Sequence, residues 1–142
     1  MNFNLERFKS AQRGSYEEAL AEMRRGRKNG HWMWYIFPQV SGLGMSATSL
    51  YYGVRGLEEA KAYMADPVLG ARLVEISNAL LDIETDDPRA VFWYPDDLKL
   101  RSCMTLFAAA APEEAVFKKV LQKFFGGRAD DMTLDILGID EI

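Results

Sequence analysis

The chain has 142 residues, of which 49% are hydrophobic and 12% aromatic, and its formal net charge is −4. This length suits one domain spanning residues 1–142, with enough apolar side chains for a packed core, which argues against global disorder. A net acidic chain lacks the electrostatic footprint of a nucleic-acid-binding protein, so we expect no nucleic-acid partner. Four basic residues nevertheless form a local patch: Arg24, Arg25, Arg27 and Lys28.

The chain has a single cysteine, Cys103, and a single histidine, His31. An internal disulfide is therefore excluded, and the ligand sets of common metal sites are missing, so we expect neither a metal nor a cofactor. No apolar run approaches the roughly 18 residues of a membrane span, and the N-terminus lacks a signal-peptide pattern. These features predict a soluble, cytoplasmic protein without a membrane partner.

Two helices are predicted before the aromatic part of the chain. They span residues 3–12 and 15–25. A capping box of Ser15 and Glu18 opens the second helix, and Gly26 suits the left-handed position that ends it. Residues 32–37 then have high β-propensity, and Pro38 ends any regular element there. This segment is predicted to be a short extended stretch, a helix or a loop, without a decision among the three.

Helices dominate the rest of the chain. After a loop at 41–46 and a helical turn at 48–54, they are predicted at 56–65, 66–83, 85–92, 97–110, 112–125 and 130–137. Asp66 opens the second of these, and Asp130 or Asp131 caps the last, which ends at Gly138. The pattern predicts an all-α fold: a single compact multihelical domain of about six to eight helices, with a short extended segment near residues 32–37 as the one exception.

The most unusual segment is the aromatic cluster at residues 31–39, HWMWYIFPQ. Such a cluster is costly to expose, so we expect it to be buried in the core, to line a pocket or to form an interface. In an extended strand Trp32 and Trp34 would share one face, whereas in a helix Trp32 and Tyr35 would share it. Gln39 and the glycine-containing loop after it add polar groups. Aromatic walls with a few polar groups are typical of a small-molecule pocket.

The predicted helix at residues 97–110 carries a second group of candidate residues. Lys99 and Ser102 lie near its start, where the helix dipole favours an anion. The same two residues are candidates for a Ser–Lys nucleophile pair, which requires a desolvated lysine, and a solvated lysine is the alternative. Asp97 and Arg101 are spaced for a surface ion pair at i and i+4.

Several separated motifs resemble those of a known family. They are LERF at residues 5–8, HWMWYIFPQ at 31–39, GLGMS at 42–46, DDLKLRSCMTLF at 96–107 and FFG at 124–126. The chain resembles the family called domain of unknown function 1810, whose members are often mislabelled calpastatin. The resemblance covers nearly the whole chain and implies a compact multihelical fold without an assigned activity. Cys103 stands where a second serine after Ser102 is expected, so no role is carried over to a hydroxyl there.

These segments together predict a pocket built from residues 31–46 and 99–105. Its ligand-binding residues are predicted to be Trp32, Trp34, Gln39, Ser46, Lys99, Ser102 and Thr105. The tryptophans would stack on the ligand, Lys99 would neutralise its charge, and the remaining polar residues would form hydrogen bonds. An aromatic wall beside a cation suits a small anionic ligand that is nucleotide-like or phosphorylated.

Catalysis in this pocket is left open by the sequence. The candidate catalytic residues are His31, Lys99 and Ser102, with the histidine as a base that titrates near neutral pH. A histidine bonded to a backbone carbonyl is the alternative. A second class of function is a protein-interaction module or homo-oligomer that uses the aromatic patch at 31–39, with the basic residues 24–28 as its rim. A third is RNA binding through the same two elements, against which the acidic net charge argues.

Overall fold

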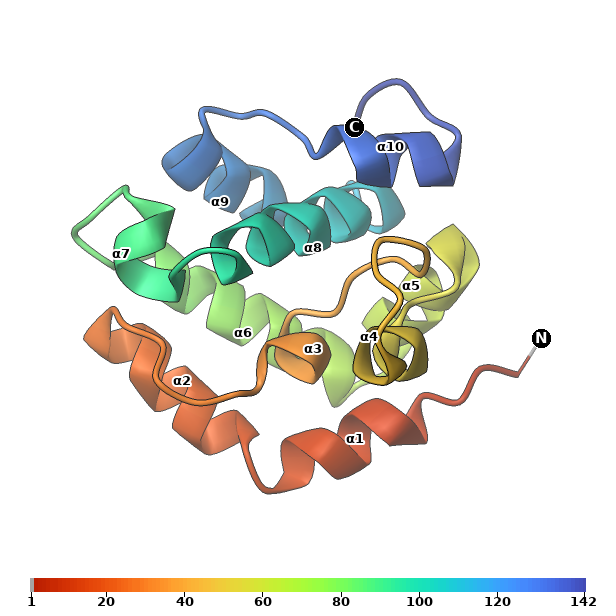
Figure 1. Ribbon diagram of the computed structural model, residues 1–142, viewed down its shortest axis with the longest axis horizontal. Coiled ribbons are helices and arrows are strands. Elements are labelled where there is room, and N and C mark those ends of the chain that lie inside the picture. The colour runs from red at the N-terminus through yellow and green to blue at the C-terminus, as the bar shows by residue number, and fades with distance from the viewer. Residues whose placement is uncertain (1) are drawn as a thin grey trace.

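The structure, a computed structural model, describes residues 2–142, and every regular element within them is a helix (Figure 1). The ten helices are α1 (Glu6–Arg13), α2 (Tyr16–Arg25), α3 (Met33–Ile36), α4 (Ala47–Tyr52), α5 (Gly56–Ala65), α6 (Leu69–Leu81), α7 (Pro88–Phe92), α8 (Asp96–Ala110), α9 (Val116–Phe125) and α10 (Asp131–Leu137). The predicted all-α fold is confirmed, but the predicted number of about six to eight helices is too low. The short helices α3 and α4 account for the difference. None of the described helices is both long and apolar enough to span a membrane.

The aromatic segment at residues 32–37 contains a helix instead of an extended stretch. Its helix α3 places Met33 and Ile36 one turn apart, and both side chains are buried. Within residues 2–142 the only strand-like pairing is an isolated parallel bridge between Val40 and Val54. Residues 32–37 therefore have no neighbouring strand to pair with, and their backbone N–H groups form local helical hydrogen bonds. Burial of the apolar side chains on a helix overrides the β-propensity of the aromatic residues.

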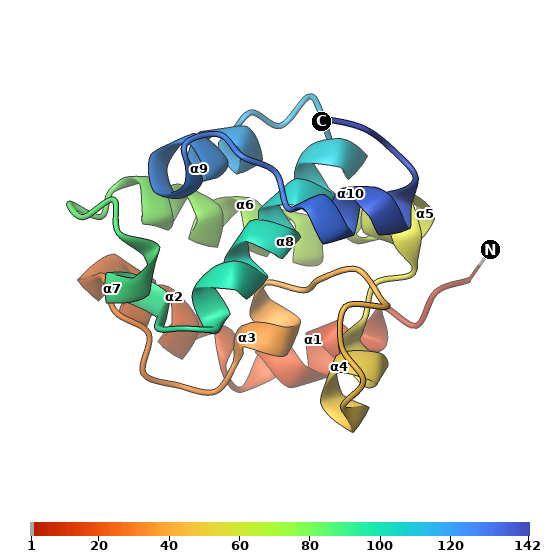
Figure 2. The ribbon, with the colours of Figure 1, turned by 45° about the horizontal axis from the view of Figure 1, so that its top comes forward.

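The long helix α8 runs through the middle of the molecule (Figure 1). Its side chains Leu100, Met104 and Phe107 are fully buried, and it packs against α5, α7, α9 and α10. Figure 2 shows the same arrangement from a second direction, with α1 and α2 on one side of α8 and α9 on the other. Because α8 packs against four other helices, its start has a defined place beside the segments that face it.

The helix ends follow the local signals in most places. Gly26 and Gly138 adopt left-handed φ angles of 84° and 73°, as predicted for helix stops. Asp130 caps α10, accepting a hydrogen bond of 2.9 Å from the backbone N–H three residues later. The predicted capping box is wrong, because Ser15 makes no cap hydrogen bond and donates its hydroxyl to the Ala11 carbonyl at 2.7 Å. The Ser15 hydroxyl therefore bonds to the end of α1 and not to the start of α2, as the sequence pattern had predicted.

A buried ion pair joins α1 to α5, and the same arginine bonds to the end of α4. The guanidinium of Arg7 makes two contacts with the Glu59 carboxylate, at 2.8 and 3.1 Å. The same side chain donates to the carbonyls of Tyr51 and Gly53 at 2.8 and 2.9 Å. Both charged groups are nearly inaccessible to solvent, so their hydrogen bonds fix the end of α4 relative to α1 and α5.

Candidate functional site

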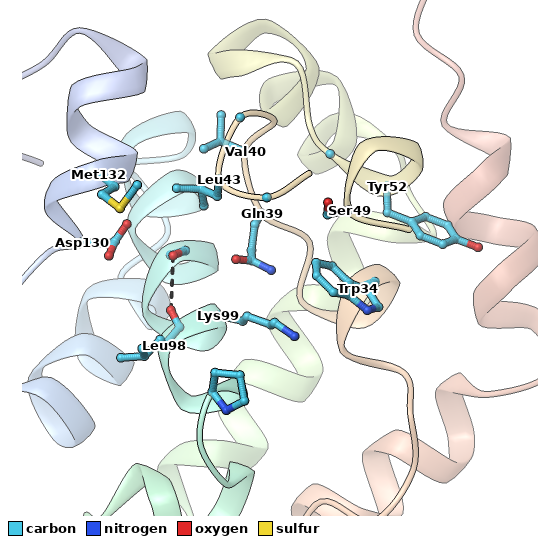
Figure 3. Close-up of a pocket in the computed structure, with 15 residues that line it drawn as sticks. Trp34, Gln39, Val40, Leu43, Ser49, Tyr52, Leu98, Lys99, Asp130 and Met132 are labelled. Atoms are coloured by element: carbon cyan, nitrogen blue, oxygen red, sulfur yellow. Dashed lines mark hydrogen bonds between the residues drawn. The ribbon is translucent and has the colours of Figure 1, made fainter. Parts of the chain in front are cut away.

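A groove of about 370 Å³ lies where three parts of the chain meet (Figure 3). The parts are the segment from α3 to the end of α4, the start of α8 and the start of α10. The lining residues from the first part are Trp34, Gln39, Val40, Gly42, Leu43, Gly44, Ser49, Tyr52 and Gly53; those at α8 are Pro95, Leu98, Lys99 and Ser102; those at α10 are Asp130 and Met132. The groove therefore combines the two segments predicted from the sequence with a third that was not predicted.

The wall formed by residues 40–54, called the 40–54 loop below, contains α4 and is closed at its base. The Ser41 N–H donates to the Val54 carbonyl, and the Val54 N–H donates to the Gln39 carbonyl, both at 2.8 Å. Gly53 lies tightly against this base, where an added Cβ would be 2.3 Å from the Ser41 hydroxyl oxygen. The base of the 40–54 loop is thus fixed by backbone hydrogen bonds and close packing, while most residues between 44 and 51 are exposed.

An aromatic ring and a cation face each other inside the groove. The Lys99 ammonium lies 4.1 Å from the centre of the Trp34 ring, within the range of a cation–π interaction. Trp34 is held by its helix, since the Gln12 side chain donates to the Tyr35 carbonyl at 2.8 Å. The Lys99 ammonium also lies 3.0 Å from a carboxylate oxygen of Asp96. The cation is therefore positioned by an aromatic face and by a counter-charge.

Asp96 is shared between two lysines. Its other carboxylate oxygen lies 2.9 Å from the ammonium of Lys28, whose side chain is buried. Burial raises the pKa of Asp96, but the hydrogen bonds from Lys28 and Lys99 outweigh burial and hold that pKa below its ordinary value. The group of Lys28, Asp96 and Lys99 consequently carries two positive charges and one negative charge. The excess positive charge is available on the side where Lys99 faces the groove.

Ser102 and Lys99 line the same groove but bond to different partners. The Ser102 hydroxyl donates to the Leu98 carbonyl at 3.2 Å, the dashed line in Figure 3. Three of the first four backbone N–H groups of α8 are also occupied: that of Asp97 donates to the Trp93 carbonyl at 3.0 Å, and those of Leu98 and Lys99 donate to the Pro95 carbonyl at 3.0 and 3.4 Å. Positive charge in the groove therefore comes from the lysine side chain more than from the helix end.

Two of the predicted ligand-binding residues are buried outside the groove. Trp32 is 2% exposed, and its indole N–H donates to the buried Glu22 carboxylate at 3.0 Å. Thr105 is fully buried, donating to the Arg101 carbonyl at 2.8 Å and accepting a hydrogen bond from the Asp130 N–H at 2.9 Å. Both residues shape the surroundings of the groove without lining it.

Two other predicted residues lie on the surface. Ser46 caps α4, accepting a hydrogen bond of 3.1 Å from the Ser49 N–H, and does not line the groove. His31 is exposed and lies outside the groove. Residues 2–142 contain no group of three or more His, Cys, Asp or Glu side chains placed to hold a metal ion. Of the predicted ligand-binding residues, the structure brings together Trp34, Gln39, Lys99 and Ser102.

The start of α10 is the part of the groove that the sequence did not predict. It is attached to α8 by Arg101, which donates to the carbonyls of Arg128 and Ala129 at 2.9 Å each. The predicted surface pair of Arg101 with Asp97 is therefore wrong, and Asp97 lies 3.5 Å from the Arg89 guanidinium instead. An N-cap signal at Asp130 was visible in the sequence, but nothing local indicated which side chains it would face.

Burial removes most of the aromatic patch at residues 31–39 from the surface. Its side chains Trp32, Met33, Ile36 and Phe37 are each at most 2% exposed. The half-buried Trp34 lines the groove, so the remaining surface of the patch is small. A protein interface centred on this patch lacks the exposed aromatic anchors that such interfaces use.

Comparisons with known proteins concern the family and the overall fold of the chain. A family model described as "Protein of unknown function (DUF1810)" matches residues 2–137. The crystal structure of the conserved hypothetical protein Rv1873 from Mycobacterium tuberculosis is similar throughout, with 43% sequence identity and a TM-score of 0.94. The similarity covers 97% of this chain and 99% of that one. No match was found among curated proteins.

Proposed function

The chain belongs to the DUF1810 family of proteins of unknown function, and we propose that its groove binds a small organic anion with a planar part, such as a nucleotide or another phosphorylated metabolite. One observation carries this proposal: the Lys99 ammonium lies 4.1 Å from the centre of the Trp34 ring, inside the groove. A cation held against an aromatic face offers charge for the anion and a flat surface for stacking.

The two contacts can serve one ligand because the lysine side chain is flexible. A cation–π contact at a partly exposed site stabilises by about 0.5–1 kcal/mol, whereas a hydrogen bond from an ammonium to an anion contributes about 1.5–3 kcal/mol. An entering anion therefore draws the Lys99 ammonium away from Trp34. The exposed face of the indole then becomes available to the planar part of the ligand.

Charge, polarity and size of the groove support the same ligand class. The net positive charge of the Lys28, Asp96 and Lys99 group favours an anion. Figure 3 shows the Gln39 amide pointing into the groove, where it can both donate and accept hydrogen bonds. A volume of about 370 Å³ lies near the lower end of the roughly 300–1,000 Å³ typical of ligand pockets. One nucleotide or metabolite fits such a volume better than a dinucleotide does.

Calorimetric titration tests this proposal directly. Wild-type protein would be titrated with AMP, ADP-ribose, ribose phosphate and inorganic phosphate, with tryptophan fluorescence recorded in parallel. We expect AMP and ADP-ribose, which carry both an aromatic base and a phosphate, to bind more tightly than ribose phosphate or inorganic phosphate. Their binding should also change the tryptophan fluorescence. Lys99→Gln and Trp34→Ala should each weaken that binding roughly tenfold or more, because each removes one of the two contacts.

Matched variants show whether the losses are specific to the groove. Lys61→Gln removes a lysine that is exposed on α5, and Trp93→Phe removes the only tryptophan that is exposed. Both should bind like the wild type. Unchanged affinity in Lys99→Gln and Trp34→Ala, or no binding of any probe at millimolar concentration, would contradict the proposal.

A further inference from the structure

The groove has opposite charges at its two ends. In Figure 3 the Lys99 and Trp34 side chains lie on one side of Gln39, and Asp130 and Met132 lie on the other. We propose that the ligand of the groove is bipolar, with an anionic group at the Lys99 end and a protonated amine at the Asp130 end. This inference rests on the proposed function, because it takes the anion at Lys99 as given and assigns the opposite end of the same ligand.

The carboxylate of Asp130 has unused capacity to accept hydrogen bonds. One of its oxygens, Oδ2, accepts from the N–H and the hydroxyl of Thr133 at 2.9 and 2.7 Å. Among residues 2–142 no ion pair joins this carboxylate to a basic side chain. Arg101, which contacts the same segment, donates to the carbonyls of Arg128 and Ala129. Where it lines the groove, the negative charge of Asp130 is therefore offset only by the hydrogen bonds from Thr133 and by the start of α10.

The middle of the groove suits the carbon body of such a ligand. Val40, Leu43 and Leu98 line it with apolar surface, and Gln39 supplies an amide between the two charged ends. A ligand with only an anionic group would leave the carboxylate of Asp130 facing apolar carbon, which is unfavourable for a charge. A ligand with an added amine gains a second charge-assisted hydrogen bond at that end.

The capping role of Asp130 can be separated from this binding role. An N-cap needs one side-chain oxygen that accepts a hydrogen bond from the helix, and asparagine provides that oxygen about as well as aspartate. Asp130→Asn therefore keeps the start of α10 while it removes the negative charge. Asp130→Ser is a second variant of the same kind, since serine is also a preferred N-cap.

Three matched probes test the inference by calorimetric titration. They are para-(aminomethyl)benzoate, which is bipolar, para-methylbenzoate, which carries the anion alone, and para-methylbenzylamine, which carries the amine alone. The biphenyl homologue of the bipolar probe covers a longer separation of the two charges. We expect one of the bipolar probes to bind wild-type protein roughly tenfold more tightly than para-methylbenzoate. Asp130→Asn should abolish this preference, and para-methylbenzoate should bind the variant at least as tightly as the wild type, because the carboxylate that opposes an anion in the same groove is removed.

Controls separate this inference from the proposed function. Asp131→Asn removes the same charge from the next residue, which is exposed and does not line the groove, so the preference should persist. If para-methylbenzoate binds in a Lys99-dependent manner but neither bipolar probe binds more tightly, or if the preference survives in Asp130→Asn and Asp130→Ser, the inference is overturned and the proposed function stands. If no carboxylate probe binds wild-type protein at millimolar concentration, the inference is overturned, and the titration with AMP and inorganic phosphate decides the proposed function separately.

Discussion

Glu22 is a single buried residue that sets the course of the chain before the groove. One oxygen of its carboxylate accepts hydrogen bonds from the N–H groups of Asn29 and Gly30 and from the Trp32 indole, at 2.6, 2.9 and 3.0 Å. Burial raises the pKa of Glu22, but these three hydrogen bonds outweigh burial and hold that pKa below its ordinary value. The ionised form is thus the one that fits the folded protein.

Glu22 gives the stability of the protein a specific pH dependence. A carboxyl group with a lowered pKa in the folded state stabilises the fold above its unfolded pKa, which is about 4.3 for glutamate. That contribution is lost as the pH falls from there through the folded pKa. Glu22→Gln should lower the free energy of unfolding by about 1–2 kcal/mol at pH 7 and flatten its decline below about pH 4.5. Urea unfolding at several pH values measures both effects.

A variant on the exposed side of the same helix provides the comparison. Glu17→Gln replaces an exposed glutamate of α2 and should follow the wild-type pH profile. Asp66 and Asp96 also have lowered pKa values, so part of the acid sensitivity should remain in Glu22→Gln. A variant with the full wild-type decline would contradict the role assigned to Glu22.

Gly53 tests the close packing at the base of the 40–54 loop. A Cβ at this position would lie 2.3 Å from the Ser41 hydroxyl oxygen and 3.0 Å from the Ser41 Cα and the Ser49 carbonyl oxygen. Two of these three atoms belong to the backbone, so the strain cannot be relieved by a side-chain rotation alone. Gly53→Ala should lower the free energy of unfolding by about 1–3 kcal/mol, as overpacking does. Gly14→Ala, which has no heavy atom within 4 Å of the added methyl, should change stability far less.

At the scale of elements, α8 holds the start of α10 against the groove. The Thr105 hydroxyl oxygen accepts the hydrogen bond of the Asp130 N–H at 2.9 Å, and Arg101 bonds to the two preceding carbonyls. Thr105→Val keeps the side-chain shape but leaves the Asp130 N–H without its partner. The free energy of unfolding should fall by about 1–2 kcal/mol. Hydrogen exchange should accelerate at the amides of α10, where the contact is lost.

Thr48→Val is the matched control for this variant, because Thr48 is exposed on α4. It should leave exchange in α10 unchanged. Equal exchange rates of the α10 amides in wild type and Thr105→Val would contradict the role assigned to the Thr105 hydroxyl.

At the scale of the whole molecule, Cys103 reports on unfolding of the common core. The thiol is fully buried in α8, and burial raises its pKa well above the ordinary value. Both effects suppress the reactive thiolate in the folded protein. A chromogenic disulfide reagent should therefore label Cys103 only in the urea range where tryptophan fluorescence shows unfolding, with the same midpoint. Labelling at much lower urea concentration would reveal a local opening of α8.

An exposed thiol calibrates this measurement. Ser10→Cys in a Cys103→Ala background places a cysteine on the exposed side of α1, and it should react without urea. The ratio of the two labelling rates then measures how strongly the fold protects the core.

Local patterns in the chain predict most of the helices. The helix expected at residues 56–65 forms over Gly56–Ala65, and the last one is capped by Asp130 and ended by Gly138, as expected. Such signals are reliable because helix hydrogen bonds and caps join residues only three or four positions apart. The short helix α3 was not predicted as a helix, because its four residues are helical through burial more than through helix propensity.

The groove depends on contacts that no local pattern contains. The chain alone placed Trp34, Gln39, Lys99 and Ser102 among the candidates, because aromatic and polar types in these two segments are typical of a pocket. The sequence could not show that Trp34 lines the groove while Trp32 is buried outside it. That difference depends on the hydrogen bond from the Trp32 indole N–H to Glu22 in the core.

The contribution of α10 to the groove is likewise a matter of packing. Asp130 reaches the groove because its N–H bonds to a threonine 25 positions earlier in the chain. Periodicity and capping act over a single helical turn, whereas burial of one helix against another joins distant residues. Local signals therefore determine the helices and the chemical types available, and the packing of α8 against its neighbours decides which side chains share one groove.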